Sequence, residues 1–310
     1  MTNDSAGERG FIEALRTLAH DPAARRFADD AAVLPMPAAE SLVLTHDMLV
    51  EGVHFLPTDP PGDVAWKLLA VNLSDLAAKG ARPVGVLMGY GLAGDSAWDS
   101  AFVAGLGAAL AAFAVPLLGG DTVAQPPGDS RVLGLTALGA GDVVVPSRSG
   151  AQVGDSLYVT GTIGDAGAGL AIARGEDGAA DLLAAYRRPQ PRLAEGRALA
   201  PLVHAMMDVS DGLLIDAERM AMASGLAVEI DLATVPLSDA LRARGDDRPA
   251  RLAAATAGDD YELLFALPAA MLPPVAATRV GRFAAGTGLT LVDGNATLPL
   301  PTRLGYLHAG

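Results

Sequence analysis

Aspartates recur directly after short apolar runs in this chain. Asp47 follows LVLTH, Asp121 follows VPLLGG and Asp208 follows HAMM, so each acid is expected to end a strand. Carboxylates that are brought together in this way repel one another unless cations neutralise them. The pattern favours a site for several magnesium ions, although each acid taken alone also fits an ordinary turn.

Asp75 joins this group by its spacing within a helix. In KLLAVNLSDLAAKGARP, Asn72, Asp75 and Lys79 recur at intervals of three and four residues and therefore share one helix face. Asn72 and Asp75 can then face a ligand together. The alternative is that Asp75 simply pairs with Lys79.

The stretch HAMMDVSDGLLID places Asp208 and Asp211 three residues apart, with Ser210 between them. One interpretation is a helix start in which Ser210 or Asp211 caps the helix that follows. The capping box fails, however, because Leu213 and Leu214 stand where Glu or Gln is required. The second interpretation is that this junction is the second domain's contribution to the metal site.

Four further features are compatible with phosphate binding. Gly120 in GGDT allows a close approach of the backbone, and GTIGDAGAGL resembles a generic anion cradle, although packing alone explains many such loops. His54 and Arg148 are candidates for phosphate contacts. A structural histidine and a solvated loop charge are the alternatives.

Composition excludes several classes of function. A net charge of −14 argues against nucleic acid or an anionic membrane as the main partner. The absence of cysteine rules out thiolate catalysis and fits a cytoplasmic location. Only Lys67 and Lys79 are lysines and no Gly-Lys-Ser/Thr occurs, so phosphate binding would need metal ions or backbone amides. We also expect no membrane span and no export signal.

The elements that must position these residues read as a mixed α/β (α+β) fold. The turn-rich stretch 141–154 predicts a boundary between domains at 1–145 and 146–310, and residues 240–251 read as an exposed connection. The main predicted strands are 41–45, 84–90, 116–118, 131–140, 156–160, 205–207, 228–231, 261–267 and 290–292. The main predicted helices are 8–19, 63–79, 97–114, one from about 166, 192–203 and 211–224.

Taken in order, the motifs resemble one family, thiamine-monophosphate kinase. They are THDMLVEGVHF, KLLAVNLSDLAAKGARP, LLGGDT, SRSGAQVGDSLYVTGTIGDAGAGL, RRPQPR, MDVSDGLLIDAERMA and GDDYELLF, and the similarity runs from about Phe27 to Tyr306. The resemblance implies a two-domain fold shared with aminoimidazole ribonucleotide synthetase. It also implies a homodimer whose first halves pair into a β-barrel-like core, with ATP and several magnesium ions held between the domains.

The same resemblance implies roles for individual positions. Metal ligands are expected at Asp30, Asp47, Asp75, Asp121, Asp208 and Asp211; ATP contacts at Gly120, Asp121, Arg148 and Ser210; and substrate contacts at His54, Asp259 and Tyr306. Four positions depart from the family pattern, namely Ala28, His46, Lys79 and Asp259, and two of them bear directly on the site. His46 stands where a metal-binding Thr or Ser is usual, so its imidazole or the neighbouring Thr45 is expected to take that place. Asp259 replaces a longer Glu.

The implied reaction converts ATP and thiamine monophosphate to ADP and thiamine diphosphate. A phosphate oxygen is already a competent nucleophile, so positioning and charge neutralisation suffice and no catalytic base or phospho-enzyme is expected. Two alternatives stay open. One is another ATP-using enzyme of the superfamily, such as aminoimidazole ribonucleotide synthetase, and the other is a non-catalytic magnesium–nucleotide sensor.

Overall fold

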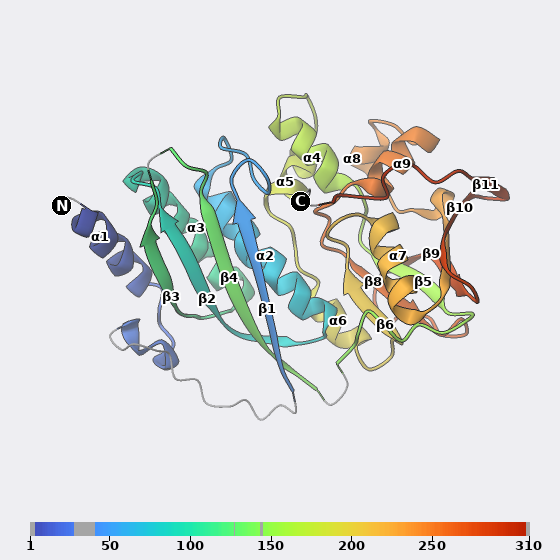
Figure 1. Cartoon of the computed structure of the whole chain (residues 1–310), viewed down its shortest axis with the longest axis horizontal. Helices are drawn as coiled ribbons and strands as arrows, with labels where there is room; N and C mark the ends of the chain where they lie inside the picture. Colours follow the sequence, from blue (N-terminus) through green and yellow to red (C-terminus); the bar gives the residue numbers. More distant parts are fainter. Residues whose placement is uncertain (1–3, 28–40, 127, 143–144, 308–310) are drawn as a thin grey trace. The chain divides into compact units, whose positions relative to one another are not determined.

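The computed structural model describes residues 4–27, 41–126, 128–142 and 145–307, and it divides into two units (Figure 1). Unit 1 comprises residues 1–76 and 82–143, and unit 2 comprises residues 77–81 and 144–310. The elements of unit 1 are α1 (Asp4–Arg16), η1 (Pro22–Phe27), β1 (Ser41–Val50), α2 (Pro61–Ala78), β2 (Arg82–Leu92), α3 (Ser96–Phe113), β3 (Leu117–Ala124) and β4 (Val132–Gly141), with the last residues of α2 falling in unit 2.

The sheet of unit 1 has the strand order β1-β4-β2-β3. β4 runs antiparallel to β1 and β2, whereas β2 and β3 are parallel. Side chains alternate between the two faces of each strand. On β4, Leu133, Leu135 and Ala137 are fully buried on the face that α2 and α3 cover (Figure 1). The intervening positions form the opposite face, which we call the open face.

Among the described residues, α3 has the length and apolar composition that a membrane crossing would need. One side of this helix nevertheless packs into unit 1, because Phe102 and Leu106 are fully buried. Asp99 lies on the same side and accepts a hydrogen bond of 2.6 Å from the Tyr90 hydroxyl. The Asp95 side chain caps the helix at Trp98 N. The helix therefore has the contacts of a layer that covers a sheet.

Unit 2 is built on a mixed sheet of seven strands in the order β11-β10-β7-β9-β5-β8-β6. The interior strand β5, between β9 and β8, is buried along its whole length. The strands are β5 (Ser156–Thr160), β6 (Ala205–Asp208), β7 (Ala227–Asp231), β8 (Leu263–Leu267), β9 (Ala277–Ala284), β10 (Gly288–Asp293) and β11 (Ala296–Leu298). The helices are α4 (Asp165–Ala173), α5 (Ala180–Arg187), α6 (Leu193–Leu199), α7 (Leu213–Ser224), η2 (Leu232–Thr234), α8 (Asp239–Arg242) and α9 (Arg248–Thr256).

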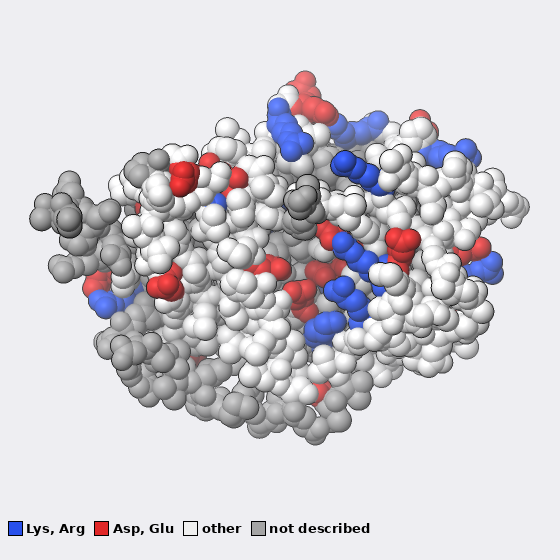
Figure 2. Space-filling model, viewed as in Figure 1, with Lys and Arg blue, Asp and Glu red and all other residues white. Residues whose placement is uncertain are grey.

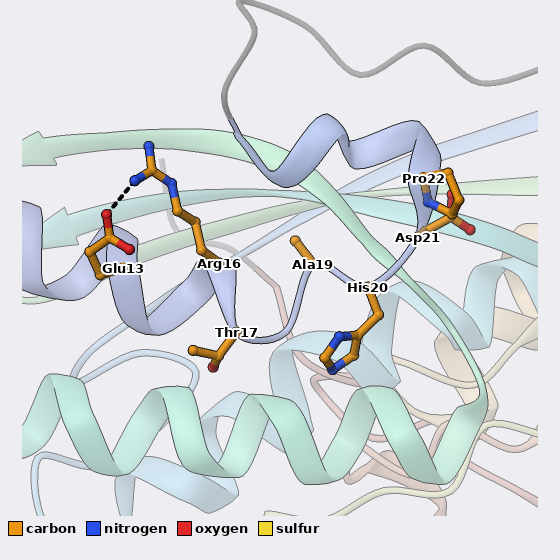
Figure 3. A pocket seen from close by; sticks show the side chains of 7 residues that line it. All are labelled: Glu13, Arg16, Thr17, Ala19, His20, Asp21 and Pro22. Carbon is orange, nitrogen blue, oxygen red and sulfur yellow. Dashed lines mark hydrogen bonds and ion pairs between the residues drawn. The ribbon is translucent and has the colours of Figure 1, made fainter.

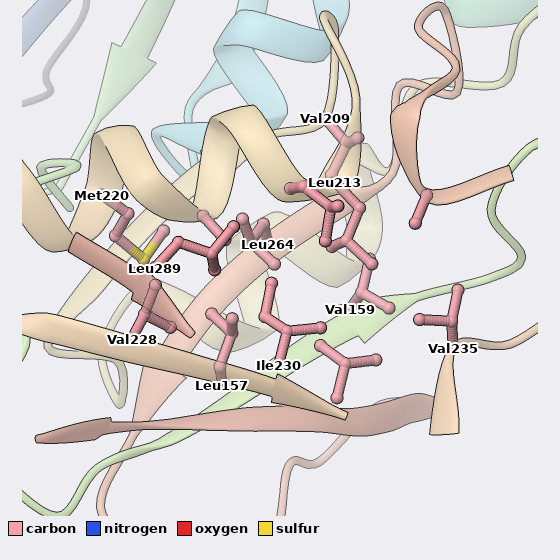
Figure 4. Packing of buried hydrophobic residues seen from close by; sticks show 14 of the residues in the cluster. Leu157, Val159, Val209, Leu213, Met220, Val228, Ile230, Val235, Leu264 and Leu289 are labelled. Atoms are coloured by element: carbon pink, nitrogen blue, oxygen red, sulfur yellow. The ribbon is translucent and has the colours of Figure 1, made fainter. Parts of the chain in front are cut away.

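The core of unit 2 lies between this sheet and α7 (Figure 4). Leu213 and Met220 of α7 are fully buried against Leu157, Ile230 and Leu264 of the sheet. Burying a side chain of this size contributes roughly 1.5–3 kcal/mol, so α7 is held firmly on the sheet. The residues just before α7 therefore start from a fixed helix end.

Residues 240–251 are largely exposed, as predicted, but they are not merely a connection. α8 and the first turn of α9 lie there. The Asp247 side chain caps α9 by accepting a hydrogen bond of 3.0 Å from Ala250 N, and a proline stands in the first turn. An aspartate followed by Arg-Pro is a recognisable helix start, which the charge of the segment obscured.

Acidic and basic side chains are interspersed on the face of the molecule shown in Figure 2. Several of the described arginines form ion pairs, including Arg131 with Glu51 and Arg244 with Glu176. Part of the positive charge is thus held in local pairs, and the net charge of the chain is −14.

Candidate functional site

Thr45, Asp47 and Asp75 meet between β1 and α2. The Thr45 hydroxyl donates a hydrogen bond to Asp75, and the Asp47 backbone N–H donates one of 2.9 Å to the Asn72 side chain. The fully buried Asn72 is fixed by its own amide, which donates to the Leu68 carbonyl at 2.9 Å. The predicted helix face therefore does point at the strand that carries Asp47.

The Asp47 carboxyl lies in an environment that disfavours its charge. Its pKa is raised to about 6, mainly by burial and also by the charge of Asp75, while His46 acts in the opposite direction. Two carboxylates that lie close together and are partly buried repel each other, and a bound cation would remove this repulsion.

His46 lies on the other side of β1. Thr45 and Asp47 pair with Ala137 and Leu135, whose side chains are buried, whereas His46 pairs with Thr136 on the open face. The His46 ring bonds the Thr136 hydroxyl at 2.9 Å. The suggestion that the imidazole could replace the usual hydroxyl ligand therefore does not fit the strand geometry, and Thr45 is the residue that shares the face of Asp47 and Asp75.

Asp121 does not share that face either. It pairs with Gly89 in the parallel β2–β3 ladder, and its neighbour Thr122 pairs with the buried Tyr90. Asp121 consequently projects from the open face, where it is exposed. The prediction that Asp47 and Asp121 end their strands is also wrong, because β1 continues to Val50 and β3 to Ala124.

Gly120 is explained by strand packing. A Cβ atom at this position would lie 2.0 Å from the Met88 carbonyl oxygen on β2, so only glycine allows the two strands to pair here. The predicted ATP contact stays a prediction. Asp30 lies outside the described residues.

His54 lies in the turn that follows β1. Its ring Nδ1 accepts a hydrogen bond of 3.0 Å from Val50 N, and its carbonyl accepts one of 3.0 Å from the Lys67 ammonium. A ring whose Nδ1 accepts carries its proton on Nε2 when neutral. His54 therefore has a structural role, and its predicted substrate contact would have to be made through Nε2.

In unit 2, two separate segments converge on the stretch Asp208–Asp211, which we call the junction. The Asp259 N–H donates to the Ser210 carbonyl at 2.8 Å, and the Tyr261 N–H donates to the Val209 carbonyl at 2.8 Å. The Tyr306 N–H donates to the Asp211 carbonyl at 2.9 Å. Predicted metal, nucleotide and substrate residues from distant parts of the sequence are thus brought together in one place.

The junction is not a capped helix start of the expected kind. Gly212 occupies the N-cap position of α7, and no side chain caps the helix there. The hydrogen bonds run in the reverse direction, since Asp216 in the first turn of α7 accepts from the N–H groups of Ser210 and Asp211 at 3.1 and 3.0 Å. Sequence reasoning gave Asp216 no role, although its full burial is unusual for an acid.

The glycine-rich loop before α4 is filled by the protein's own acid. Asp260 accepts two hydrogen bonds from Gly164 N, at 3.0 and 2.8 Å, and a longer one from Ala166 N at 3.5 Å. The carboxylate therefore occupies the place at the helix N-terminus where a phosphate would bind, and the suggestion of an anion cradle is wrong. Burial raises the pKa of Asp260 well above its usual value, against the effect of these hydrogen bonds.

Backbone strain flanks Asp260. Asp259 and Tyr261 have φ values of 71° and 51°, a conformation that costs residues other than glycine roughly 1–2 kcal/mol each. The Tyr261 hydroxyl donates to the Asp259 carboxylate at 3.2 Å. This distorted turn lets Asp260 point into the α4 loop while its two neighbours bind the junction backbone.

Two arginines from the recognised motifs have different positions. Arg192 of RRPQPR donates through Nε to the buried Glu262 at 2.7 Å, and the Thr160 hydroxyl donates to the same carboxylate at 2.6 Å. Arg148 is exposed, in a loop whose Ser147 carbonyl accepts a hydrogen bond of 2.8 Å from Met206 N on β6. Arg192 thus binds Glu262 directly after the strained turn, a role that sequence reasoning missed. Arg148 lies beside β6, the strand that ends at Asp208.

The residues of both units fit magnesium by their chemistry, since they offer hydroxyl and carboxylate oxygens, which Mg²⁺ prefers. Thr45, Asp47 and Asp75 provide such donors in unit 1, and Asp208 and Asp211 provide them in unit 2. Among the described residues, no three His, Asp or Glu side chains are grouped closely enough to hold a metal by themselves. Each unit therefore presents a partial set of ligands.

A hollow in unit 1 lies away from these residues (Figure 3). It is lined by residues that join α1 to η1, namely Glu13, Arg16, Thr17, Ala19, His20, Asp21 and Pro22. Arg16 pairs with Glu13 at its rim. None of the residues predicted for metal, nucleotide or substrate binding lines it, so it is not the candidate site.

Comparison with known proteins matches both units to one family. The family models for the N-terminal and C-terminal domains of AIR synthase related proteins match residues 28–140 and 152–295. The thiamine-monophosphate kinase of Caulobacter vibrioides is 40% identical over 310 residues, covering 93% of this chain and 86% of the relative.

Solved structures agree. The crystal structure of thiamine-monophosphate kinase from Stenotrophomonas maltophilia is 37% identical, with a TM-score of 0.81, and the match covers 94% of this chain and 96% of that one. A structure of AaThiL complexed with AMPPCP and TMP is 29% identical, with a TM-score of 0.77, over 99% of each chain. These findings confirm the resemblance drawn from the motifs and the two-domain mixed α/β fold: the chain belongs to the thiamine-monophosphate kinase family of AIR synthase related proteins.

Proposed function

We propose that this chain transfers the γ-phosphoryl group of ATP to thiamine monophosphate. The observation that carries the proposal is the match over 99% of the chain to AaThiL complexed with AMPPCP and TMP. The geometry supports it, because the residues expected to contact nucleotide and substrate, Ser210, Asp259 and Tyr306, converge on one junction. Family membership favours this reaction over that of aminoimidazole ribonucleotide synthetase.

The transfer is direct. A phosphate oxygen of thiamine monophosphate attacks the γ-phosphorus of ATP, the bond from that phosphorus to the β–γ bridging oxygen breaks, and ADP leaves with the electron pair. Magnesium would neutralise the negative charge between ATP and thiamine monophosphate. Its ligands would be Thr45, Asp47 and Asp75 in unit 1, and Asp208 and Asp211 in unit 2. The chain's own contribution is positioning: Asp216 fixes the Ser210 and Asp211 amides, and the Asp259–Tyr261 turn fixes their carbonyls.

ADP release measured with and without thiamine monophosphate tests this function. We expect turnover that depends on thiamine monophosphate and on added Mg²⁺, with thiamine diphosphate as the product. Tight ATP binding without substrate-stimulated turnover would instead support a nucleotide sensor. A phosphoprotein trapped from labelled ATP would contradict direct transfer.

We propose that two copies of the chain pair through the open face of unit 1. Apolar side chains on this face are exposed, and exposed apolar patches of this kind mark association surfaces. They are Leu42, Leu44, Met48, Leu87, Val123 and Val132. Asp121 lies on the same face, so pairing through it would place Asp121 at the contact with the partner chain.

Leu44→Asp tests this pairing by analytical ultracentrifugation. We expect the wild type to sediment as a dimer and the variant as a folded monomer, because Leu44 is 61% exposed within one chain and an aspartate would be buried at the interface. Leu272→Asp, at an exposed apolar position of unit 2, is the matched control and should leave the dimer intact. A variant that remains dimeric would show that this face is not the interface.

A further inference from the structure

Arg219 of α7 is the cation that contacts the junction. Its Nη1 donates to Asp216 Oδ1 at 2.8 Å and also bonds Asp211 Oδ2. The two carboxylates differ in their surroundings, because Asp216 is fully buried and Asp211 is partly exposed. One guanidinium therefore neutralises a buried acid and, at the same time, an acid that solvent can reach.

Asp216 keeps this guanidinium in place. Its other oxygen, Oδ2, accepts hydrogen bonds from the N–H groups of Ser210 and Asp211, so both carboxylate oxygens are hydrogen-bonded within the protein. Removing Arg219 from it would leave a buried charge without its cation, which is strongly unfavourable. Arg219 is consequently a fixed positive charge beside Asp211, in contrast to the mobile charge of a surface arginine.

We infer that Arg219 competes with a divalent cation for the Asp211 carboxylate and so weakens metal binding at that residue. The inference rests on the proposed function, because it takes Asp211 as a magnesium ligand. A cation bound by Asp211 would gain that carboxylate's charge while standing near the guanidinium held by Asp216. At a separation of about 5–6 Å in a dielectric close to that of water, and with screening by salt, the repulsion between the guanidinium and a divalent ion would weaken binding roughly five- to tenfold.

Weakened binding suits a metal that accompanies a nucleotide. A magnesium ion held by several unopposed acids would remain on the protein after the product leaves. Competition by Arg219 makes retention of the ion depend on the nucleotide phosphates, which supply additional negative oxygens. Arg219 would thus link the residence of the metal to that of the nucleotide.

Calorimetric titration of the nucleotide-free chain with Mg²⁺ tests the inference. The variants are Arg219→Gln, Asp211→Asn and the two combined. We expect Arg219→Gln to tighten binding five- to tenfold in the native background and to change it less than twofold when Asp211 is Asn. Arg282→Gln is the matched control, since it removes the same charge from a surface pair with Glu229 in unit 2, and it should leave the affinity unchanged.

A second measurement separates competition from folding. In chelator, Arg219→Gln should lower Tm because Asp216 loses its cation, and adding Asp216→Asn should restore most of that loss. The double variant with Arg219→Gln and Asp216→Asn should still bind Mg²⁺ more tightly than the wild type. If Arg219→Gln alone, or Arg219→Gln combined with Asp216→Asn, binds Mg²⁺ no more tightly than the wild type, the inference is overturned, whatever the folding result.

The proposed function is tested independently, by measuring the turnover of the wild type with thiamine monophosphate. An active wild type together with an unchanged Arg219→Gln affinity would reject the competition alone. Should Asp211→Asn bind Mg²⁺ as the wild type does, Asp211 is not a ligand and the inference falls, while the turnover assay still decides the reaction.

Discussion

Asp47→Asn should lower kcat/KM by about a thousandfold or more and, in chelator at pH 7.5, should raise Tm. The loss of activity follows from removing one of the few carboxylates that a cation in unit 1 can use, since electrostatic stabilisation carries most of phosphoryl transfer. The gain in stability follows from the environment of the carboxyl, whose pKa burial raises to about 6.

The sign of the stability effect can be worked out from this pKa. The folded chain holds the Asp47 proton up to about pH 6, whereas an unfolded aspartate releases it near 3.8. The folded state therefore binds more protons between these values, and the free energy of unfolding falls as pH rises through them. Above pH 6 the ionised carboxyl costs the wild type on the order of 2 kcal/mol, after allowance for solvent, and an asparagine avoids this cost.

Asp99→Asn is the matched control for this prediction. Asp99 is another acid of unit 1 whose pKa burial raises, but it belongs to α3 and accepts a hydrogen bond from the Tyr90 hydroxyl. The control should keep activity within a few-fold of the wild type. Thermal melts over pH 4–8 together with steady-state kinetics make the measurement, and an Asp47→Asn enzyme with near-normal kcat/KM would remove Asp47 from the site.

Asp208→Asn should lower kcat/KM by at least about a hundredfold while moving Tm by only a few degrees. Asp208 is the last residue of β6 and the first of the junction, and the strand's register with β8 is set by backbone hydrogen bonds that the substitution keeps. Its carboxylate contributes charge to the site more than it contributes to packing.

Asp155→Asn gives the comparison. Asp155 is buried to a similar degree in the same unit, but it accepts a hydrogen bond from Gln152 N at 2.8 Å and pairs with His204. This variant should lose stability and keep its specific activity. If instead Asp208→Asn unfolds the chain and the remaining folded fraction is fully active, Asp208 has a structural role only.

Local patterns were sufficient to predict much of the fold. The Ala- and Leu-rich runs predicted α2 and α3 to within a few residues, because both helices bury a continuous apolar side. The spacing of Asn72 and Asp75 correctly predicted a shared helix face that meets β1. These features depend on a single element and its periodicity.

Features that depend on pairing between distant strands could not be predicted. The faces of His46 and Asp121 follow from the registers with Thr136 and Gly89, and a one-residue shift in register would reverse them. The glycine at 120 suggested a ligand, whereas the neighbouring strand requires it. Asp216, Asp260 and Arg192 act on partners that only the folded sheet brings near.

The junction also has a consequence for how the chain is made. The junction lies near residue 210 and its backbone partners lie near residues 260 and 306. The hydrogen bonds that fix it therefore join residues up to almost a hundred positions apart. Contacts between such distant residues form late in folding. During translation, β6 and α7 emerge from the ribosome well before Tyr306 does, and the Asp211 carbonyl stays open to water until then. A nascent chain should therefore gain its nucleotide-binding competence in a late step, after most of unit 2 has been synthesised.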